Sequence, residues 1–250
     1  MLRLALTCLL LLSAPATAMV GGAPPAAGIA RASVMIVGSR GNSCTGTMIA
    51  RDLLLTAAHC VQPGADYKLV EFDDKRQPAL RDVARVAIHP QFNMQTFLGH
   101  RATADVALVK LAAPLSISPA VMMSDVPKVV PGDRLTVAGY GVTERGNGKT
   151  GGTLRAATLA ATGKPGNLQI RLVDPAGNGA TAGLGACTGD SGGPVFQDHN
   201  GQLLIVGVIS WSTGPNNSDG CGGLTGVTPL SLYRGWIVET ARKLGSPIVP

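Results

Sequence analysis

The sequence predicts an all-β fold in two halves, built of antiparallel barrels or sandwiches, with one helix at the C-terminus. Short alternating or β-branched runs recur along the chain without helical crossovers between them, which favours antiparallel sheets. The 33 glycines and 17 prolines supply turn signals between the runs, such as Pro63-Gly64 and Asn200-Gly201. Residues 112–132 are rich in proline and read as a connector between the two halves.

Each half contains six predicted strands. Those of the first half are Ser33–Val37, Thr45–Ile49, Leu53–Thr56, Tyr67–Phe72, Val83–Ile88 and Val106–Leu111. Those of the second half are Arg134–Tyr140, Thr153–Leu159, Leu168–Val173, Pro194–Gln197, Leu203–Trp211 and Leu224–Val227.

The last predicted element is a helix over about residues 230–244. Its apolar residues fall at helical spacing and its charged residues face elsewhere. Thr228 is positioned to cap the start, and Gly245 to end the helix before Pro247. The apolar set is Leu232, Trp236, Ile237, Ala241 and Leu244, and the charged set is Arg234, Glu239, Arg242 and Lys243.

Composition excludes several classes of protein. Hydrophobic residues make up 45% of the 250 residues, which is enough to bury a sizeable core and rules out disorder as the main state. There is no glycine period or long charged heptad run, so collagen and coiled coil are excluded. The net charge is +6, but the basic residues are scattered, so we expect a solvated basic surface and no nucleic-acid partner.

The first 18 residues have the pattern of a signal peptide. Arg3 precedes the apolar run Leu4–Leu12, and Ala16-Thr17-Ala18 is an A-x-A-type cleavage site. A run of nine residues is too short to span a bilayer, which needs about 20, although a buried N-terminal helix is the alternative. We therefore expect a mature chain of residues 19–250 without a stable membrane anchor. It would be secreted to the extracellular space, or to the periplasm of a double-membraned bacterium.

Cysteine usage fits an exported protein. Removal of the leader also removes Cys8, which leaves an even number of cysteines and suggests two disulfides. Four cysteines allow three pairings, and their number alone does not determine which pairing forms. A zinc site is disfavoured because the chain has no C-x-x-C pair with a matching histidine pair, so we expect no metal and no cofactor. The remaining cysteines are Cys44, Cys60, Cys187 and Cys221.

Three short segments carry potential chemistry. Gly189-Asp190-Ser191-Gly192-Gly193-Pro194 offers a serine nucleophile between glycines, Thr56-Ala57-Ala58-His59-Cys60 offers a base, and Asp105 heads an apolar strand. Each segment alone also has a non-catalytic explanation. The Ser191 segment could be a Gly-rich turn, His59 a structural histidine and Asp105 a charge at a strand edge. Together they supply base, acid and nucleophile in the chain order of a His-Asp-Ser triad.

The segments TAAHC, DVALVKL and GDSGGP, with Ser210-Trp211-Ser212 downstream, resemble the trypsin/chymotrypsin family of serine proteases. The resemblance extends from Val20-Gly21-Gly22 to the helix bearing Trp236. It implies two six-stranded β-barrels, the first over about residues 19–120 and the second over about 121–229, followed by the helix over about 230–244. It also implies a secreted, monomeric serine endopeptidase that acts on protein or peptide substrates.

The resemblance assigns roles to residues of this chain. Ser191 would attack the scissile carbonyl, His59 would carry the proton, and Asp105 would hold the imidazole. The backbone amides of Gly189 and Ser191 would form the oxyanion hole. The implied disulfides are Cys44–Cys60 beside His59 and Cys187–Cys221 beside the Ser191 loop.

The resemblance also suggests how substrate binds. Ser210-Trp211-Ser212 resembles the strand edge to which substrates of the family add by β-augmentation. Gly185 stands where trypsin-type members carry an aspartate, and Ile209 where glutamate-specific relatives carry a histidine. We therefore expect an uncharged, apolar side chain before the scissile bond (the P1 residue). The other predicted pocket residues, all small and uncharged, are Ala186, Ser212 and Gly226.

The resemblance further suggests an activation pair. Met19-Val20-Gly21-Gly22 begins where the leader would be cut, although family members carry isoleucine in place of Met19. We expect leader removal to free the Met19 ammonium to pair with Asp190, without a propeptide. Such pairing raises the pKa of the ammonium, so the ordered site would fail as the pH rises through that pKa.

Two other functions compete with this interpretation. The sequence around Ser191 also matches the G-x-S-x-G motif of α/β-hydrolase esterases. That fold needs an acid and then a histidine after the serine, and only His199 follows, eight residues on. The second alternative is a catalytically silent, protease-like binding or adhesion protein. It is disfavoured because all three triad residues are present.

Overall fold

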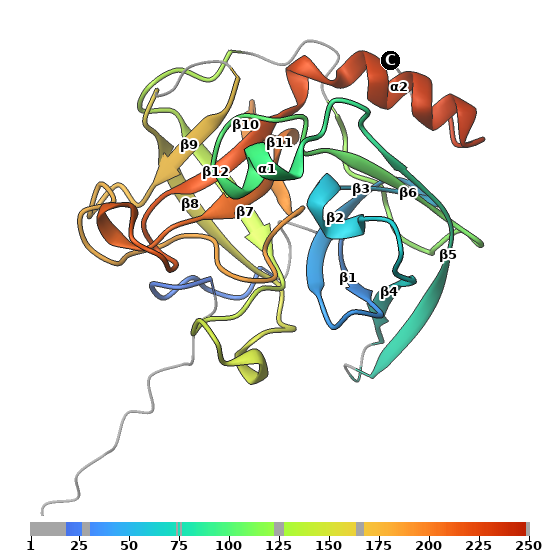
Figure 1. Cartoon of the computed structure of the whole chain (residues 1–250), viewed down its shortest axis with the longest axis horizontal. Helices are drawn as coiled ribbons and strands as arrows, with labels where there is room; N and C mark the ends of the chain where they lie inside the picture. The colour runs from blue at the N-terminus through green and yellow to red at the C-terminus, as the bar shows by residue number, and fades with distance from the viewer. Residues whose placement is uncertain are drawn as a thin grey trace, which may run out of the picture.

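The computed structural model describes residues 19–26, 31–73, 75, 77–122, 128–163 and 168–248, and the predicted signal peptide lies outside them. Within these residues the chain forms two closed six-stranded antiparallel β-barrels, so the barrel interpretation is confirmed over the sandwich. Figure 1 shows the barrels side by side, with the C-terminal helix along the upper edge of the molecule. All twelve predicted strands form, two of them with the predicted bounds and the others with shifted ends.

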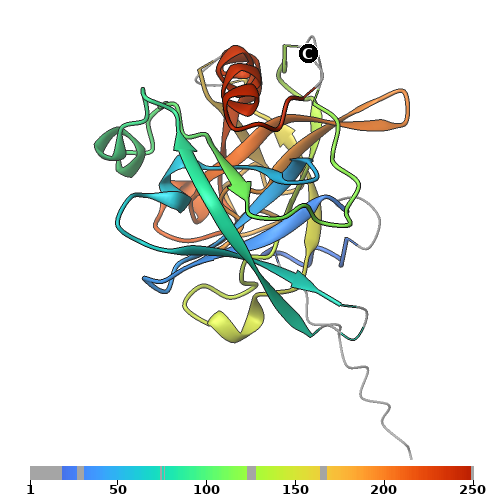
Figure 2. The ribbon, with the colours of Figure 1, turned by 90° about the vertical axis from the view of Figure 1, so that its right-hand side faces the viewer.

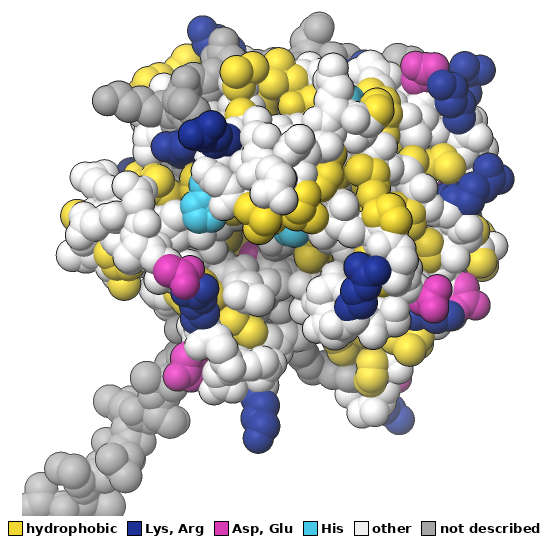
Figure 3. Space-filling model, in the orientation of Figure 1, with side chains coloured by type: hydrophobic (Ala, Val, Ile, Leu, Met, Phe, Trp, Pro, Cys, Tyr) yellow, Lys and Arg dark blue, Asp and Glu magenta, His cyan; other side chains and the backbone are white. Residues whose placement is uncertain are grey.

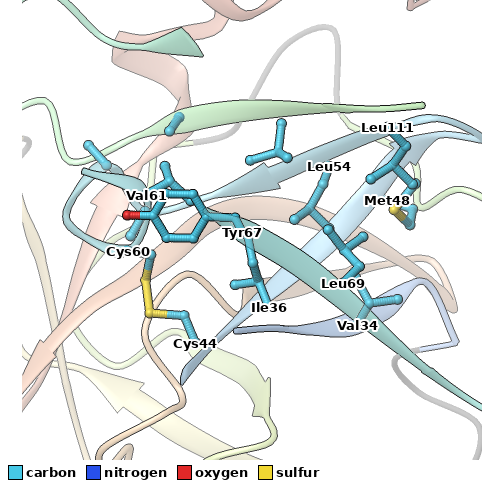
Figure 4. Close-up of a cluster of buried hydrophobic side chains, with 14 of the residues drawn as sticks. Val34, Ile36, Cys44, Met48, Leu54, Cys60, Val61, Tyr67, Leu69 and Leu111 are labelled. Atoms are coloured by element: carbon cyan, nitrogen blue, oxygen red, sulfur yellow. A yellow bond between two sulfur atoms is a disulfide. The ribbon is translucent and has the colours of Figure 1, made fainter. Parts of the chain in front are cut away.

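The first barrel is filled by aliphatic side chains, and its strand β3 (Leu53–Thr56) is buried along its whole length. Along β3, Leu54 points into the barrel interior while Leu53 and Leu55 join a cluster shared with the second barrel. Figure 4 shows the interior side chains, among them Ile36 and Leu69. The strands run β1-β2-β3-β6-β5-β4 around the barrel and are β1 (Ser33–Gly38), β2 (Ser43–Ala50), β3 (Leu53–Thr56), β4 (Tyr67–Phe72), β5 (Pro78–Ile88) and β6 (Ala107–Leu111).

The second barrel repeats this arrangement with the order β10-β11-β12-β9-β8-β7. Leu135, Leu159 and Val206 belong to its own core, whereas Phe196 and Val208 belong to the shared cluster. Because successive strand residues point to opposite faces, one strand can serve both cores. The strands are β7 (Arg134–Gly139), β8 (Arg155–Ala161), β9 (Ile170–Val173), β10 (Pro194–His199), β11 (Gln202–Ser212) and β12 (Thr225–Pro229).

The C-terminal helix α2 (Arg234–Lys243) is shorter than predicted, because residues 230–232 form a 3-10 turn before it. The predicted cap by Thr228 is wrong: Thr228 lies in β12, and the N-cap is Tyr233, which makes no side-chain capping bond. Gly245 ends the helix as predicted, with φ of +75°. The Ser246 amide donates back to the Ala241 carbonyl at 2.9 Å.

Five further short elements complete the described chain. The helix α1 (Met94–Leu98) lies in the β5–β6 loop and was not predicted. In Figure 1 it lies in front of the junction between the barrels, and Figure 2 shows it projecting from the body of the molecule. The 3-10 turns are η1 (Ala58–Val61), η2 (Gly148–Thr150), η3 (Pro215–Asn217) and η4 (Leu230–Leu232). No helix among the described residues has the length and apolar character needed to cross a membrane.

Residues 19–26 lie against the second barrel, although they precede the first in sequence. Val20 bridges to Gly185 and Pro25 bridges to Arg155, both in antiparallel fashion. The Met19 side chain is fully buried in the core of the second barrel. The start of the described chain therefore lies close to the loop that leads to Ser191.

Candidate active site

His59 lies where the first barrel faces the second. Strand β3 ends at Thr56, and the turn η1 carries His59 after two fully buried alanines, Ala57 and Ala58. The structure forms the Cys44–Cys60 disulfide that the resemblance implied, which ties this turn to β2. The His59 side chain remains 14% exposed and faces the junction of the two barrels.

Asp105 is completely buried, and its burial is compensated by three hydrogen bonds. One carboxylate oxygen accepts the His59 backbone amide at 2.9 Å. The other lies 2.8 Å from His59 Nδ1 and accepts the Ser210 hydroxyl at 2.5 Å. With Nδ1 held as a donor to the carboxylate, the neutral imidazole presents Nε2 as a proton acceptor.

Ser210 reaches Asp105 because of a β-bulge. Strand β11 pairs Ile209 with Val227 and Trp211 with Gly226, so Ser210 is an extra residue with no partner of its own. Bulges turn a side chain away from the regular alternation of a strand. The sequence predicts Ser210 on the substrate-binding edge but does not predict its bond to the buried carboxylate.

The Ser191 loop follows a path that only glycine permits at two positions. Gly189 and Gly192 have φ of +96° and +79°. A Cβ on Gly192 would lie 2.1 Å from the Thr56 hydroxyl and 2.3 Å from the Thr45 carbonyl oxygen. The loop therefore packs its backbone directly against β2 and β3, which a larger residue would prevent.

Hydrogen bonds from the first barrel fix this loop beside His59. The Thr45 amide donates to the Ser191 carbonyl and the Thr45 hydroxyl to the Gly189 carbonyl, both at 2.8 Å. The Ser191 carbonyl lies 3.6 Å from Cys60 Sγ, which lies 3.7 Å from His59 Nε2. Because a disulfide sulfur carries no hydrogen, these last two are packing contacts. Within the described residues the Ser191 hydroxyl makes no hydrogen bond, to the imidazole or to any other group.

The same loop leaves two amides available. The Asp190 amide donates to Cys187 and the Gly193 amide to Asp190, which closes the turn around Ser191. The amides of Gly189 and Ser191 have no acceptor in the part of the chain that the structure describes. Two neighbouring unpaired amides next to a serine are the donor pair that an oxyanion hole requires.

Asp190 is completely buried in a space that glycines provide. A Cβ on Gly139 would lie 2.2 Å from an Asp190 carboxylate oxygen. The carboxylate accepts the Gly141 amide at 2.9 Å and the Cys187 amide at 2.8 Å. Burial raises the pKa of Asp190 to about 7, although the two amides and the charge of Arg155 act to lower it.

The predicted pocket residues divide into two groups. Gly185 and Ala186 lie together, and the Ala186 amide donates to the Thr225 hydroxyl at 3.0 Å. A Cβ on Gly226 would lie 2.1 Å from the Trp211 indole, so this position faces the indole. The residue of β12 on the side of Gly185 is Thr225, which the sequence analysis missed. Neighbouring strand residues point to opposite faces, so an offset of one residue exchanges the two positions.

The second disulfide and a group of potential metal ligands lie at the edges of the site. The second implied disulfide, Cys187–Cys221, forms and links the Ser191 loop to the segment before β12. Ligand atoms of Cys44, His59 and Cys60 lie within 4.8 Å of one another. Both sulfurs belong to a disulfide and are not thiolates, so this group does not fit a metal ion.

Comparison with known proteins gives one consistent result. A family model described as Trypsin matches residues 19–237. The chain is 31% identical over 231 residues to the vitellin-degrading protease of Bombyx mori, a match covering 85% of this chain and 80% of that protein. It is 29% identical over 218 residues to a trypsin of Phaedon cochleariae, covering 78% of each chain. It is 28% identical over 223 residues to human chymotrypsin-like elastase family member 1, covering 80% of this chain and 81% of that protein.

Proposed function

Because this chain belongs to the trypsin family of serine endopeptidases, we propose that it cleaves peptide bonds through an acyl-enzyme on Ser191, with His59 as base and Asp105 as orienting acid. The observation that carries this proposal is the contact of 2.8 Å between His59 Nδ1 and the buried Asp105 carboxylate. The hydrogen bonds of Thr45 support the role of Ser191, because they hold its loop beside the imidazole.

The proposed reaction has two steps. His59 Nε2 takes the Ser191 hydroxyl proton as the oxygen attacks the carbonyl carbon, and the imidazolium then gives that proton to the leaving amine. Water attacks the resulting ester in the second step, again with His59 as base, and releases the acid and Ser191. In both steps the developing oxyanion would accept hydrogen bonds from the Gly189 and Ser191 amides.

For activation, we propose that cleavage after Ala18 frees the Met19 ammonium to pair with Asp190. Support comes from Val20, which bridges to Gly185, and from the complete burial of Asp190 without a cationic hydrogen-bond partner among the bonds found for its carboxylate. An ammonium inserted there would compensate the buried charge. We further propose that the mature enzyme is secreted and acts on extracellular proteins or peptides.

For specificity, we propose that the P1 side chain is uncharged, apolar and small. Gly185 and Ala186 carry no charge, so a basic or acidic side chain would be buried without a counter-ion. Thr225 narrows the space further, since its hydroxyl lies 3.5 Å from the point that a Gly185 Cβ would occupy.

Labelling with a fluorophosphonate tests the proposed catalytic residues in a chain beginning at Met19. We expect one phosphonylated residue, Ser191, located by mass spectrometry of the peptide. His59→Ala should abolish labelling, whereas His199→Ala, at an exposed position of β10, should leave it unchanged. A folded chain that remained unlabelled would contradict the proposal and favour the binding or adhesion protein.

A further inference from the structure

The segment of residues 93–103, which contains α1, crosses from one barrel to the other through two aromatic contacts. The Phe97 ring stacks on the His59 imidazole with centroids 4.2 Å apart and planes at 16°. The His100 ring stacks on the Trp211 indole with centroids 4.7 Å apart and planes at 15°. His59 belongs to the first barrel and Trp211 to β11 of the second, so this segment, which we name the clasp, spans their junction. Figure 3 shows hydrophobic side chains gathered over this part of the surface.

The clasp covers surfaces that a bound substrate would need. Trp211 packs on Gly226 of β12 and under His100, and only 6% of it remains exposed. It lies in the Ser210–Ser212 edge, to which an extended substrate would add as a strand under the proposed function. Phe97 lies on the ring that must exchange a proton with the substrate. Both covered rings therefore lie along the proposed path of the polypeptide.

The clasp is weakly attached to the rest of the molecule. None of the five residues of α1 is buried, and Leu98 is 63% exposed. Its base is closed by side-chain hydrogen bonds, from the Thr96 amide to Asn93 Oδ1 and from the Asn93 amide to Thr103 Oγ1, both at 2.9 Å. Segments with few buried apolar contacts are the ones that open locally at low free-energy cost.

The backbone of His100 is left-handed while the clasp lies over Trp211. Its φ is +50°, in the left-handed region that is uncommon for residues other than glycine, although histidine adopts it more often than most. Such a conformation persists where surrounding contacts favour it, and here the His100 amide donates to the Phe97 carbonyl at 2.9 Å while the ring stacks on Trp211. Loss of that stack would allow the backbone to relax as the clasp opens.

We propose that the clasp is an autoinhibitory lid, which an extended polypeptide must displace before it can pair with the Ser210–Ser212 edge. This inference rests on the proposed function. A small substrate that reaches only Ser191 and the P1 pocket would not need to displace it. The lid therefore weakens the binding of long substrates selectively, because part of their binding free energy must replace the two ring stacks that are lost.

The test compares two thiobenzyl esters, N-acetyl-alanine and N-acetyl-tetra-alanine, which share P1 residue and leaving group. The variants are Phe97→Ala, His100→Ala and the double variant, in chains beginning at Met19. We expect kcat/KM for the long ester, relative to the short one, to rise about two- to tenfold in each single variant and about five- to a hundredfold in the double variant. Leu98→Ala, an exposed neighbour on α1, should leave this ratio within about twofold of the unmodified chain.

Two results would overturn the lid. A fall in kcat/KM for the long ester alone would mean that Phe97 and His100 bind substrate instead of obstructing it. An equal change for both esters would mean that Phe97 only positions the His59 ring. If the unmodified chain hydrolysed neither ester, the proposed function itself would be wrong, which distinguishes that failure from failure of the lid.

Discussion

Thr225 and Gly226 are neighbours on β12 with different surroundings. Thr225 is fully buried and accepts the Ala186 amide, whereas Gly226 lies under the Trp211 ring. The size of residue 225 therefore controls the space beside Gly185. Residue 226 must remain small for a different reason, the close approach of the indole.

We predict that Thr225→Gly broadens the P1 preference. Removing the side chain should raise kcat/KM for a peptide with phenylalanine at P1, relative to one with alanine, by about tenfold or more, since one to two buried methyl groups are freed for substrate. Thr225→Ser is the matched control, because it keeps the hydroxyl that accepts the Ala186 amide and should give a smaller change. Dominant cleavage after arginine or lysine by the unmodified chain would contradict the proposed pocket.

The residues of the site differ in how far the sequence predicts them. His59, Asp105 and Ser191 stand in motifs whose residue types are dictated by the chemistry. The position of Ser210 depends on a bulge, and the face occupied by Thr225 depends on the register that follows it. Bulges and register arise from pairing between distant strands, so local pattern does not reveal them.

Strands and helices also differ in how far the sequence predicts them. Strand β3 was predicted with its observed bounds, because an unbroken run of leucines buried on both faces has no other favourable environment. Strand β5 begins at Pro78 instead of Val83, since its first residues are exposed and are held by backbone pairing with β4. The helix α1 is only five residues long, so Met94, Phe97 and Leu98 give too short an apolar pattern to indicate a helix, and none of its residues is buried.

The state of the N-terminus should determine how the stability of the protein depends on pH. In a chain beginning at Thr17, Met19 is linked by a peptide bond, so Asp190 keeps a pKa of about 7 against its ordinary 3.8. The folded state then binds the proton more tightly than the unfolded state. This stabilisation is fully present below about pH 4 and is lost as the pH rises through about 7, with a total of up to about 4 kcal/mol.

Urea unfolding of that chain between pH 4 and pH 8 measures this loss as a falling free energy of unfolding. Asp190→Asn in the same chain removes the titrating group and should flatten this part of the profile. A chain beginning at Met19 should also lose less stability over this range, because the free ammonium would lower the pKa of Asp190. Identical profiles for the two starts would contradict the activation pair.

The whole molecule is held together by the cluster shared between the barrels. Leu53 and Leu55 of the first barrel and Phe196 and Val208 of the second pack in it with Ile237 of α2. The hydrogen bonds of Thr45 to the Ser191 loop cross the same junction. Because the proposed triad takes residues from both barrels, its geometry depends on this packing as much as on either barrel alone.

We therefore expect the barrels to unfold together and Ile237→Ala to destabilise both. Ile237 is fully buried, and its truncation should lower the free energy of unfolding by about 2–5 kcal/mol. Leu232→Ala, at a position that is 46% exposed, should lower the free energy of unfolding much less.

Tryptophan fluorescence follows Trp211 in the second barrel and Trp236 on α2, while far-UV circular dichroism follows both barrels. Coincident transitions by the two methods are expected, since removing either barrel would expose the shared cluster. Two separate transitions would mean that each barrel is stable without the other, and that the triad is assembled by docking of independently folded halves.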